Sequence, residues 1–228
     1  MTIRSFAAAV IVVLLLAGCN QSKPAPSAGE AFLTALNTPP ADPHWLEVEI
    51  EGVELGLWVP PGWVADVQDG LILAEHFTTL QSGDQLFSGM VVYIFVPSLD
   101  TFEIPADLGD DHNMAWMVLS QAINKPEMLG SAAASEPQAF TWGAHNAAYY
   151  LLTNPDGMQT LVMGIALPSR RLLVLNLSAP PEYVPMREAV TALLDGITVD
   201  GVMLHSADLT ALPANFDFPA RPTPESGN

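Results

Sequence analysis

The chain has 228 residues, of which 50% are hydrophobic and 14% are charged, and it contains 25 acidic but only 7 basic residues. This apolar content excludes a chain that is disordered throughout, and the length suits one ordinary domain with flanking segments. The formal net charge of −18 repels phosphate groups, so we expect no nucleic acid partner, and the folded body should not adhere to anionic lipid head groups.

The first 18 residues have the form of an export signal. A basic start ending at Arg4 precedes an apolar run from Phe6 to Gly18. A helix of this length reaches about 20 Å, whereas a membrane hydrocarbon core is about 30 Å thick. The run is too short to span a membrane, and we predict a signal peptide over residues 1–18.

The run ends in Leu16-Ala17-Gly18-Cys19, and Cys19 is the single cysteine of the chain. This stretch resembles the lipobox of bacterial lipoproteins, in which the cysteine thiol receives a diacylglyceryl group and a peptidase cuts before the cysteine. The resemblance implies that Cys19 carries fatty acyl chains such as palmitate, and that the protein is held on a cell membrane, facing away from the cytoplasm. A cysteine buried in an ordinary signal or helix is the alternative. No second cysteine is present, so an internal disulfide is excluded.

Two segments beside the domain have compositions of their own. Residues 19–44 are rich in Pro, Ser, Ala and Asn, which indicates a flexible tether. Residues 206–228 are predicted to form a Pro-rich C-terminal tail outside the domain, and its part from Pro213 to Asn228, which lacks periodicity, is expected to be mobile. The pattern between them predicts a single domain over residues 45–205.

Alternating apolar residues predict the first strands. Residues 46–50 and 53–59 flank the turn Glu51-Gly52 and form a hairpin pattern, which ends at Pro60-Pro61-Gly62. Further strands are predicted over residues 71–77 and 89–96. The last of these is apolar throughout, so we expect a central strand buried on both faces.

A meander of three more strands is predicted over residues 147–153, 159–166 and 172–178. The first connection is Asn154-Pro155-Asp156-Gly157, a β-turn sequence, and the second is Pro168-Ser169-Arg170.

Helical spacing appears twice. Met114, Met117, Val118 and Ala122 follow Asp110 and Asp111, either of which can cap the helix. Pro180-Pro181 opens the second predicted helix, which Gly196 ends and whose apolar positions are Tyr183, Met186, Val190, Leu193, Leu194 and Ile197. The order of elements predicts an α+β fold, an antiparallel sheet with helices packed on it.

Three stretches carry a resemblance to a known family. They are Val59-Pro60-Pro61-Gly62-Trp63, Asn154-Pro155-Asp156-Gly157, and Ala179-Pro180-Pro181-Glu182-Tyr183 followed by Leu194-Asp195-Gly196-Ile197. Over residues 46–200 they resemble the PsbP-like superfamily, which is named for an extrinsic subunit of photosystem II and includes bacterial lipoproteins. The resemblance implies an α/β/α sandwich and a non-catalytic role in assembly, binding or stress tolerance, and it supplies no active-site motif.

The sequence contains no recognisable catalytic motif. None of its five histidines (His44, His76, His112, His145 and His205) stands four residues from another, as a zinc-binding helix would require. A Gly-x-Ser-x-Gly elbow, a Gly-x-Gly-x-x-Gly loop and a P-loop are all absent from the sequence. We therefore expect no enzymatic activity and no cofactor.

The acidic stretch from Asp107 to Asn113 is the main candidate for a metal site. The carboxylates of Asp107, Asp110 and Asp111 could share a hard cation such as calcium, although the EF-hand spacing is absent. The simpler interpretation, which we favour, is a solvated loop whose aspartates cap the following helix. An acid–base pair of Asp111 and His112 is a third interpretation.

Aromatic residues offer a second candidate site. A binding cleft could be lined by Trp58, Trp63, Trp116, Trp142, Tyr149 and Tyr150. Packing in the core is the interpretation that we favour for them.

Three functions are compatible with the sequence. The first is a lipid-anchored, non-catalytic module that binds or supports another envelope protein. The second is a lipoprotein that binds a small ligand or metal ion and presents it to a transporter. The third is a hydrolase of an unrecognised kind, which would need a Ser or Asp beside a His.

Overall fold

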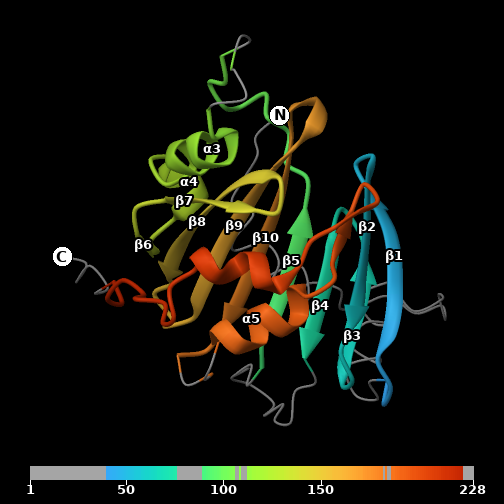
Figure 1. Ribbon diagram of the computed structural model, residues 1–228. Coiled ribbons are helices and arrows are strands. Elements are labelled where there is room, and N and C mark those ends of the chain that lie inside the picture. The colour runs from blue at the N-terminus through green and yellow to red at the C-terminus, as the bar shows by residue number, and fades with distance from the viewer. Residues whose placement is uncertain are drawn as a thin grey trace, which may run out of the picture.

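The computed structural model describes residues 40–75, 89–105, 108, 112–181, 183 and 186–222 (Figure 1). The expectations that fall on the signal peptide, Cys19, most of the tether, and Asp107, Asp110 and Asp111 lie outside these residues. Within the described ranges, no helix has the length and hydrophobicity needed to cross a membrane.

The larger sheet is antiparallel and has eight strands. Its order is β3-β4-β5-β10-β9-β8-β6, and β7 also pairs with β8. The strands are β3 (Trp63–Val67), β4 (Leu71–Glu75), β5 (Val91–Phe95), β6 (Ala133–Ala134), β7 (Gln138–Trp142), β8 (His145–Thr153), β9 (Gln159–Leu167) and β10 (Arg171–Ala179). The predicted meander is confirmed as β8, β9 and β10, which pair in sequence order.

A smaller sheet lies beside the larger one and has the order β1-β2-β11-β12. It consists of β1 (His44–Ile50), β2 (Val53–Val59), β11 (Thr198–Val199) and β12 (Val202–Met203). The predicted hairpin is confirmed, because Ile50 pairs with Val53 across the turn Glu51-Gly52, where φ is 48° and 75°. Two successive positive φ angles are typical of the tight turns that match the twist of a hairpin.

The alternation of side chains along the large sheet creates two cores. On β9, Leu161, Met163 and Ile165 face the main core, while Val162 faces a second, smaller one. The smaller core lies beneath α3 (Met114–Ala122), which is followed by the short helix α4 (Pro126–Leu129). The main core is closed by α5 (Met186–Leu194), the small sheet and the 3-10 helix η3 (Ser206–Ala211), and Figure 1 shows α5 in front of the large sheet. The α+β architecture is thereby confirmed.

Strand β5 is central but differs from the expectation of full burial. It lies between β4 and β10, and Val92 and Ile94 are completely buried on the main-core face. The residues of the opposite face, Val91, Tyr93 and Phe95, are only half-buried. The reason is that α3 packs mainly on β8 and β9, so that this face of β5 lies at the border of the smaller core, against which Phe95 packs.

Several short strands were not predicted from the sequence. Strand β3 begins at Trp63, directly after the Pro60-Pro61-Gly62 turn, and pairs with β4. Strand β7 pairs with β8 through the tight connection at Gly143, where φ is 58°. These strands have at most five residues and are flanked by turn residues, so their alternation is weak.

The residues expected to cap or open the two helices differ from those observed. Helix α3 begins at Met114, as the spacing predicted, but the expectation that Asp110 or Asp111 caps it is wrong. The N-cap of α3 is Asn113, whose side-chain oxygen accepts a hydrogen bond from the Trp116 backbone N–H at 3.0 Å. Pro180 does not open α5; it follows β10 in a turn, in which the Tyr183 N–H donates to the Pro180 carbonyl at 2.9 Å. The described part of α5 begins at Met186, and Gly196 follows its end with a φ of 76°.

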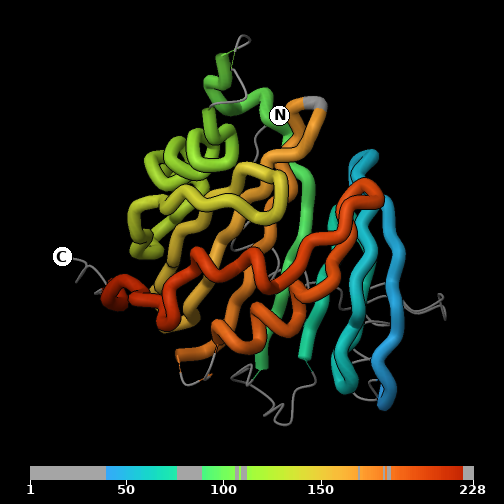
Figure 2. The backbone as a smooth tube through the Cα atoms, in the orientation of Figure 1, coloured from blue at the N-terminus to red at the C-terminus, as the bar shows by residue number. Residues whose placement is uncertain are grey.

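The C-terminal segment is packed on the body as far as the structure describes it. Leu209 and Leu212 are 1% and 3% exposed, and the Thr153 hydroxyl donates to the Pro219 carbonyl at 2.7 Å. Figure 2 shows this segment, in red, running across the front of the large sheet. The predicted domain boundary at residue 205 is therefore wrong, and so is the expectation of mobility for residues 213–222, because residues 206–222 belong to the folded body.

Candidate functional site

Among the residues that the structure describes, those singled out from the sequence do not converge on one site. Cys19 and the acidic candidates lie outside the described residues, and His112, which follows them, is exposed. Within the described part of the chain, no three His, Cys, Asp or Glu side chains are grouped closely enough to hold a metal ion.

The aromatic residues separate into buried and exposed groups. Core packing is confirmed for Trp63, Trp142, Tyr149 and Tyr150, each of which is at most 8% exposed. It is wrong for Trp58 and Trp116, which are 52% and 45% exposed. These two residues come from β2 and α3, which lie in different layers, so the six residues do not form a common cleft.

Trp58 belongs to the solvent-facing side of the small sheet, which we call the outer face. The opposite side packs on the main core through Leu55, Leu57 and their neighbours, so alternate residues must face outwards. By the register of the strands, the outer face consists of Trp45, Glu47, Glu49, Glu54, Gly56, Trp58, Thr198 and Met203. Met203 is 54% exposed, so the face has an apolar side chain at its far edge as well.

A pair of tryptophans lies at one end of this face. Trp45 and Trp58 are directly opposite each other on β1 and β2, and their rings meet edge to face with centroids 5.6 Å apart. The Trp45 ring lies over Gly56, since a Cβ built on Gly56 would be only 2.5 Å from Trp45 Cζ2. The Trp45 indole N–H donates to Glu47 Oε1 at 2.8 Å. Trp45 is thus fixed in place, and it supports one side of the more exposed Trp58.

Carboxylates occupy the rest of the outer face. Glu49 and Glu54 stand directly opposite each other on β1 and β2, next to Glu47. Like charges at opposite positions of an antiparallel pair destabilise it. Among the described residues, no Lys or Arg forms an ion pair with either carboxylate. The face therefore presents concentrated negative charge beside an exposed aromatic ring.

The hydrogen-bond pattern of the hairpin leaves one edge available. Because Ile50 and Val53 flank a two-residue turn, they form a hydrogen-bonded pair, and Glu49–Glu54 is the next, non-hydrogen-bonded pair. Consistent with this, the Glu54 carbonyl accepts from the Asp200 N–H at 2.8 Å, on the side away from β1. The backbone groups of Trp45, Glu47 and Glu49 must point away from β2 in the same way. Since β1 is the terminal strand of its sheet, they face an edge with which no strand of the described residues pairs.

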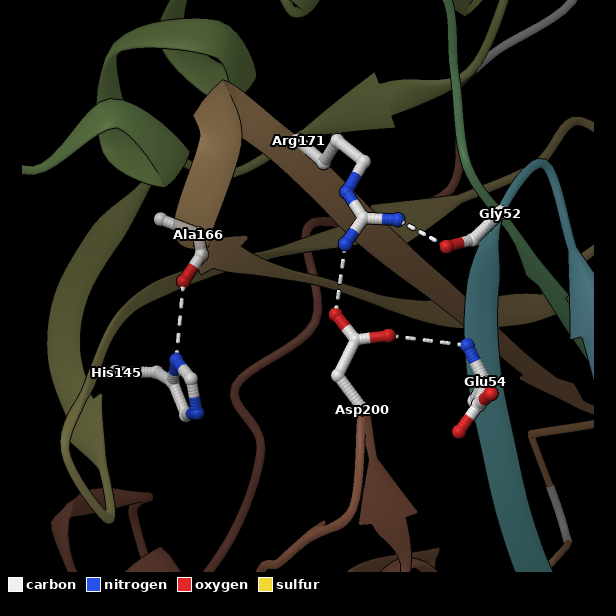
Figure 3. A network of polar contacts seen from close by, with 6 residues as sticks. All are labelled: Gly52, Glu54, His145, Ala166, Arg171 and Asp200. Atoms are coloured by element: carbon white, nitrogen blue, oxygen red, sulfur yellow. Dashed lines mark hydrogen bonds and ion pairs between the residues drawn. The ribbon is translucent and has the colours of Figure 1, made fainter.

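A polar network ties the small sheet to the large one (Figure 3). Arg171, at the start of β10, forms an ion pair with Asp200 at 2.8 Å and donates to the Gly52 carbonyl. Asp200 also accepts from the Glu54 backbone N–H at 3.0 Å. Asp200 has a φ of 48°, a left-handed conformation that Asp tolerates better than most residues. The network connects both turns of the small sheet to β10 and so fixes the orientation of the outer face.

His145 gives no support to an acid–base site. Its Nδ1 lies 3.2 Å from the Ala166 carbonyl oxygen, as Figure 3 shows, and its Nε2 is buried without a hydrogen-bond partner. In the described part of the chain, no Ser or Asp side chain is bonded to this ring. The contact links β8 to β9 and is structural.

A shallow depression of about 430 Å³ lies beside α5 and is lined by Arg187, Glu188, Thr191, Ala192, Asp195 and Ser206. Three of its polar residues, Arg187, Asp195 and Ser206, are already engaged in holding the C-terminal segment. The Ser206 hydroxyl donates to Asp195 at 2.8 Å, and Arg187 Nε donates to the Pro213 carbonyl at 2.9 Å. The hydrogen bonds from Ser206 lower the pKa of the Asp195 carboxyl. These contacts explain the depression as part of the packing of residues 206–213.

Burial of tyrosines produces the largest shifts in ionisation. Burial raises the pKa of Tyr150 to about 12. It also raises the pKa of Tyr183 to about 12, aided by the charge of Glu75 and a hydrogen bond to that carboxylate. Both tyrosines remain neutral at physiological pH, and their raised pKa values affect the stability of the fold in alkaline solution.

Sequence reasoning missed the outer face, although a signal for it was present. The predicted two-residue turn at Glu51-Gly52 fixes the register of the hairpin, and this register places Trp45 opposite Trp58 and Glu49 opposite Glu54. The same alternation places the apolar residues Leu55 and Leu57 on one face and Trp58 with the glutamates on the other, so the exposure of Trp58 could also have been inferred.

No protein-family model matches the chain, and no curated protein is significantly similar to it in sequence. Among solved structures, cyanobacterial PsbP from Synechocystis is similar with a TM-score of 0.44 and 12% identity, over 81% of this chain and 98% of that chain. The Ran-binding protein Mog1p of Saccharomyces cerevisiae has a TM-score of 0.36 and 16% identity, over 65% and 82% of the two chains. A protein of unknown function from Pseudomonas aeruginosa has a TM-score of 0.35 and 17% identity, over 64% and 90%. The α+β architecture of the present chain rests on its own strand pairing.

Proposed function

We propose that the chain is a membrane-anchored, extracytoplasmic lipoprotein whose PsbP-like domain is a non-catalytic module that binds or supports another envelope protein. The lipobox-like stretch ending at Cys19 supports the anchor, and the strand ends and turns quoted above support the PsbP-like assignment. The anchor would confine the domain to a thin layer near the membrane, which raises its effective concentration for partners there.

The main support for the binding role is the exposure of Trp58 on the outer face. A tryptophan that is 52% exposed leaves apolar area in water that a partner can cover. Tryptophan is enriched among the residues that dominate the binding energy of protein interfaces. Trp45 and the Arg171–Asp200 network hold the surface around it in a fixed shape, so little ordering is needed when a partner binds.

The test is purification of the protein from its own membranes. The full-length chain with its own signal is extracted gently, and co-purifying molecules are identified by mass spectrometry. The Cys19→Ala variant is the control for anchoring. A stoichiometric protein partner that is lost with Cys19→Ala supports the proposal. A monomer carrying a metal ion or small molecule contradicts it, and a Cys19→Ala variant that stays on the membrane contradicts the lipid anchor.

A further inference from the structure

The outer face combines three features that favour one kind of partner. The first is the half-exposed aromatic ring of Trp58, and the second is the pair of carboxylates of Glu49 and Glu54, which stand opposite each other. The third is the terminal strand β1, which has backbone groups that point away from β2. A cation is attracted both to the face of an indole ring and to carboxylates. A second copy of this chain, with its own acidic face, would be repelled.

We propose that the outer face binds an extended, basic segment of the envelope partner, which pairs with the edge of β1. This inference rests on the proposed function and names the chemistry of the partner. In an added strand, alternate side chains would project over the outer face beside Trp45, Glu47 and Glu49. Lys or Arg at these alternate positions would meet the tryptophan pair at one end and the Glu49–Glu54 pair at the other.

The spacing of the face sets the spacing of the basic residues. Trp45 and Glu49 are four residues apart on β1, which is about 13 Å in an extended strand. One cation cannot reach both ends of the face. The partner segment should therefore carry basic residues at every second position, over at least five residues.

Charged residues on a terminal strand also have a simpler role, since they prevent unwanted pairing between sheets. That role accounts for Glu47 and Glu49. It does not account for Trp58, whose exposed ring would favour association, or for a second carboxylate directly opposite Glu49 on β2. Electrostatic selection of a basic strand accounts for all of them.

The test uses the full-length protein in detergent and a fluorescently labelled peptide of seven residues in which Lys alternates with Thr. A second peptide of the same composition has its three Lys residues contiguous, and a third has Glu in place of Lys. Fluorescence anisotropy at low salt measures the affinities. We expect the alternating Lys peptide to bind about threefold or more tightly than the contiguous one, and the Glu peptide not to bind.

Matched variants distinguish the contribution of the outer face to peptide binding from that of the overall negative charge of the protein. Trp58→Ala should weaken binding of the alternating peptide about two- to fivefold, whereas Trp116→Ala, which removes an exposed tryptophan elsewhere, should not. The double variant Glu49→Gln/Glu54→Gln should weaken binding about threefold or more. Glu127→Gln/Glu136→Gln changes the net charge equally at exposed positions and should leave it unchanged. Thermal unfolding of each variant confirms that it is folded.

Two results would overturn the inference: equal affinity for the alternating and contiguous peptides, or equal weakening by the outer-face and control variants. Its failure is distinguishable from failure of the proposed function. If a stoichiometric partner is recovered from native membranes but the protein shows no preference among the peptides, the proposed binding function stands and the inference of a basic partner strand is wrong. If the alternating peptide binds specifically but no partner is recovered from native membranes, the outer face binds basic segments and the proposed role in supporting an envelope protein is wrong.

Discussion

The Trp45 ring lies over Gly56, in the space that a side chain at position 56 would fill. A Cβ on Gly56 would be 2.5 Å from Trp45 Cζ2 and 2.5 Å from Thr198 Oγ1. The absence of a side chain at this position is therefore what allows the aromatic ring to pack against the small sheet and to contact Trp58.

We predict that Gly56→Ala lowers the free energy of unfolding by about 1–3 kcal/mol, because the added methyl group overpacks this position. The measurement is chemical denaturation of the variant and the parent protein. The double variant Trp45→Ala/Gly56→Ala is the control: removing the ring should relieve much of the penalty. Strictly additive effects of the two substitutions would show that the ring does not occupy this space.

Asp200→Asn tests the link between the two sheets. Asn keeps an oxygen that can accept from the Glu54 N–H and tolerates the positive φ, so the substitution removes mainly the charge that pairs with Arg171. Both side chains are 29% exposed, and we expect a loss of about 0.5–1 kcal/mol in the free energy of unfolding.

High salt should reduce the difference between Asp200→Asn and the parent protein, because it screens the ion pair. Asp100→Asn, at an exposed position, is the matched control and should be neutral. A difference that is the same at low and high salt would mean that the charge of Asp200 is not what stabilises the link.

Leu209→Ala tests whether the C-terminal segment is part of the folded body. Leu209 is 1% exposed and belongs to the main core, so the substitution should lower the free energy of unfolding by about 2–4 kcal/mol. Val202→Ala, at a position that is 48% exposed, is the control and should have little effect. A fully stable Leu209→Ala protein would restore the interpretation of a tail outside the domain.

Stability should fall in alkaline solution because of Tyr150. The folded state raises its pKa from 10.0 to about 12, so the neutral form is the one that folding favours. A raised pKa contributes stability that is complete below pH 10 and is lost as the pH rises towards 12. The loss from this one residue should reach about 2 kcal/mol near pH 12.

The measurement is the free energy of unfolding at about pH 9 and about pH 11, for the parent and Tyr150→Phe. The variant should lose less stability between these values. Tyr183→Phe should also reduce the loss, since the pKa of Tyr183 is raised to about 12 as well. Parallel pH profiles for all three proteins would contradict the assigned environments.

The sequence was sufficient for the elements with strong periodicity. The hairpin of β1 and β2, the meander of β8 to β10, and the buried stripe of α5 at Met186, Val190, Leu193 and Leu194 follow from spacing and turn residues. Strands β4 and β5 have only five residues but were predicted from their apolar sequences, whereas β3 and β7, of the same length, were missed because apolar and polar residues are mixed in them without a clear alternation. Residues 206–222 were misinterpreted because proline content was taken as disorder, whereas Leu209 and Leu212 anchor the segment.

The candidate site was only partly predictable, because exposure depends on tertiary packing where alternation is weak. Trp58 and Trp63 lie five residues apart, yet one is half-exposed and the other is 7% exposed. They differ because Trp58 faces away from the main core while Trp63, in another sheet, faces into it. The alternation in the hairpin places Trp58 on the face of Glu47, Glu49 and Glu54, so its exposure could have been predicted. Trp63 follows a turn in a strand without a clear alternation, and its burial required the structure.

The most direct test of the proposed binding role is the recovery of partner protein with Trp58→Ala and with Trp116→Ala. Each full-length variant is purified from native membranes beside the parent protein, and the ratio of co-purified partner to bait is measured by quantitative mass spectrometry. We predict that Trp58→Ala loses most of the partner while Trp116→Ala retains it. Full recovery with Trp58→Ala, or equal loss with both variants, would contradict the assignment of the outer face as the binding surface.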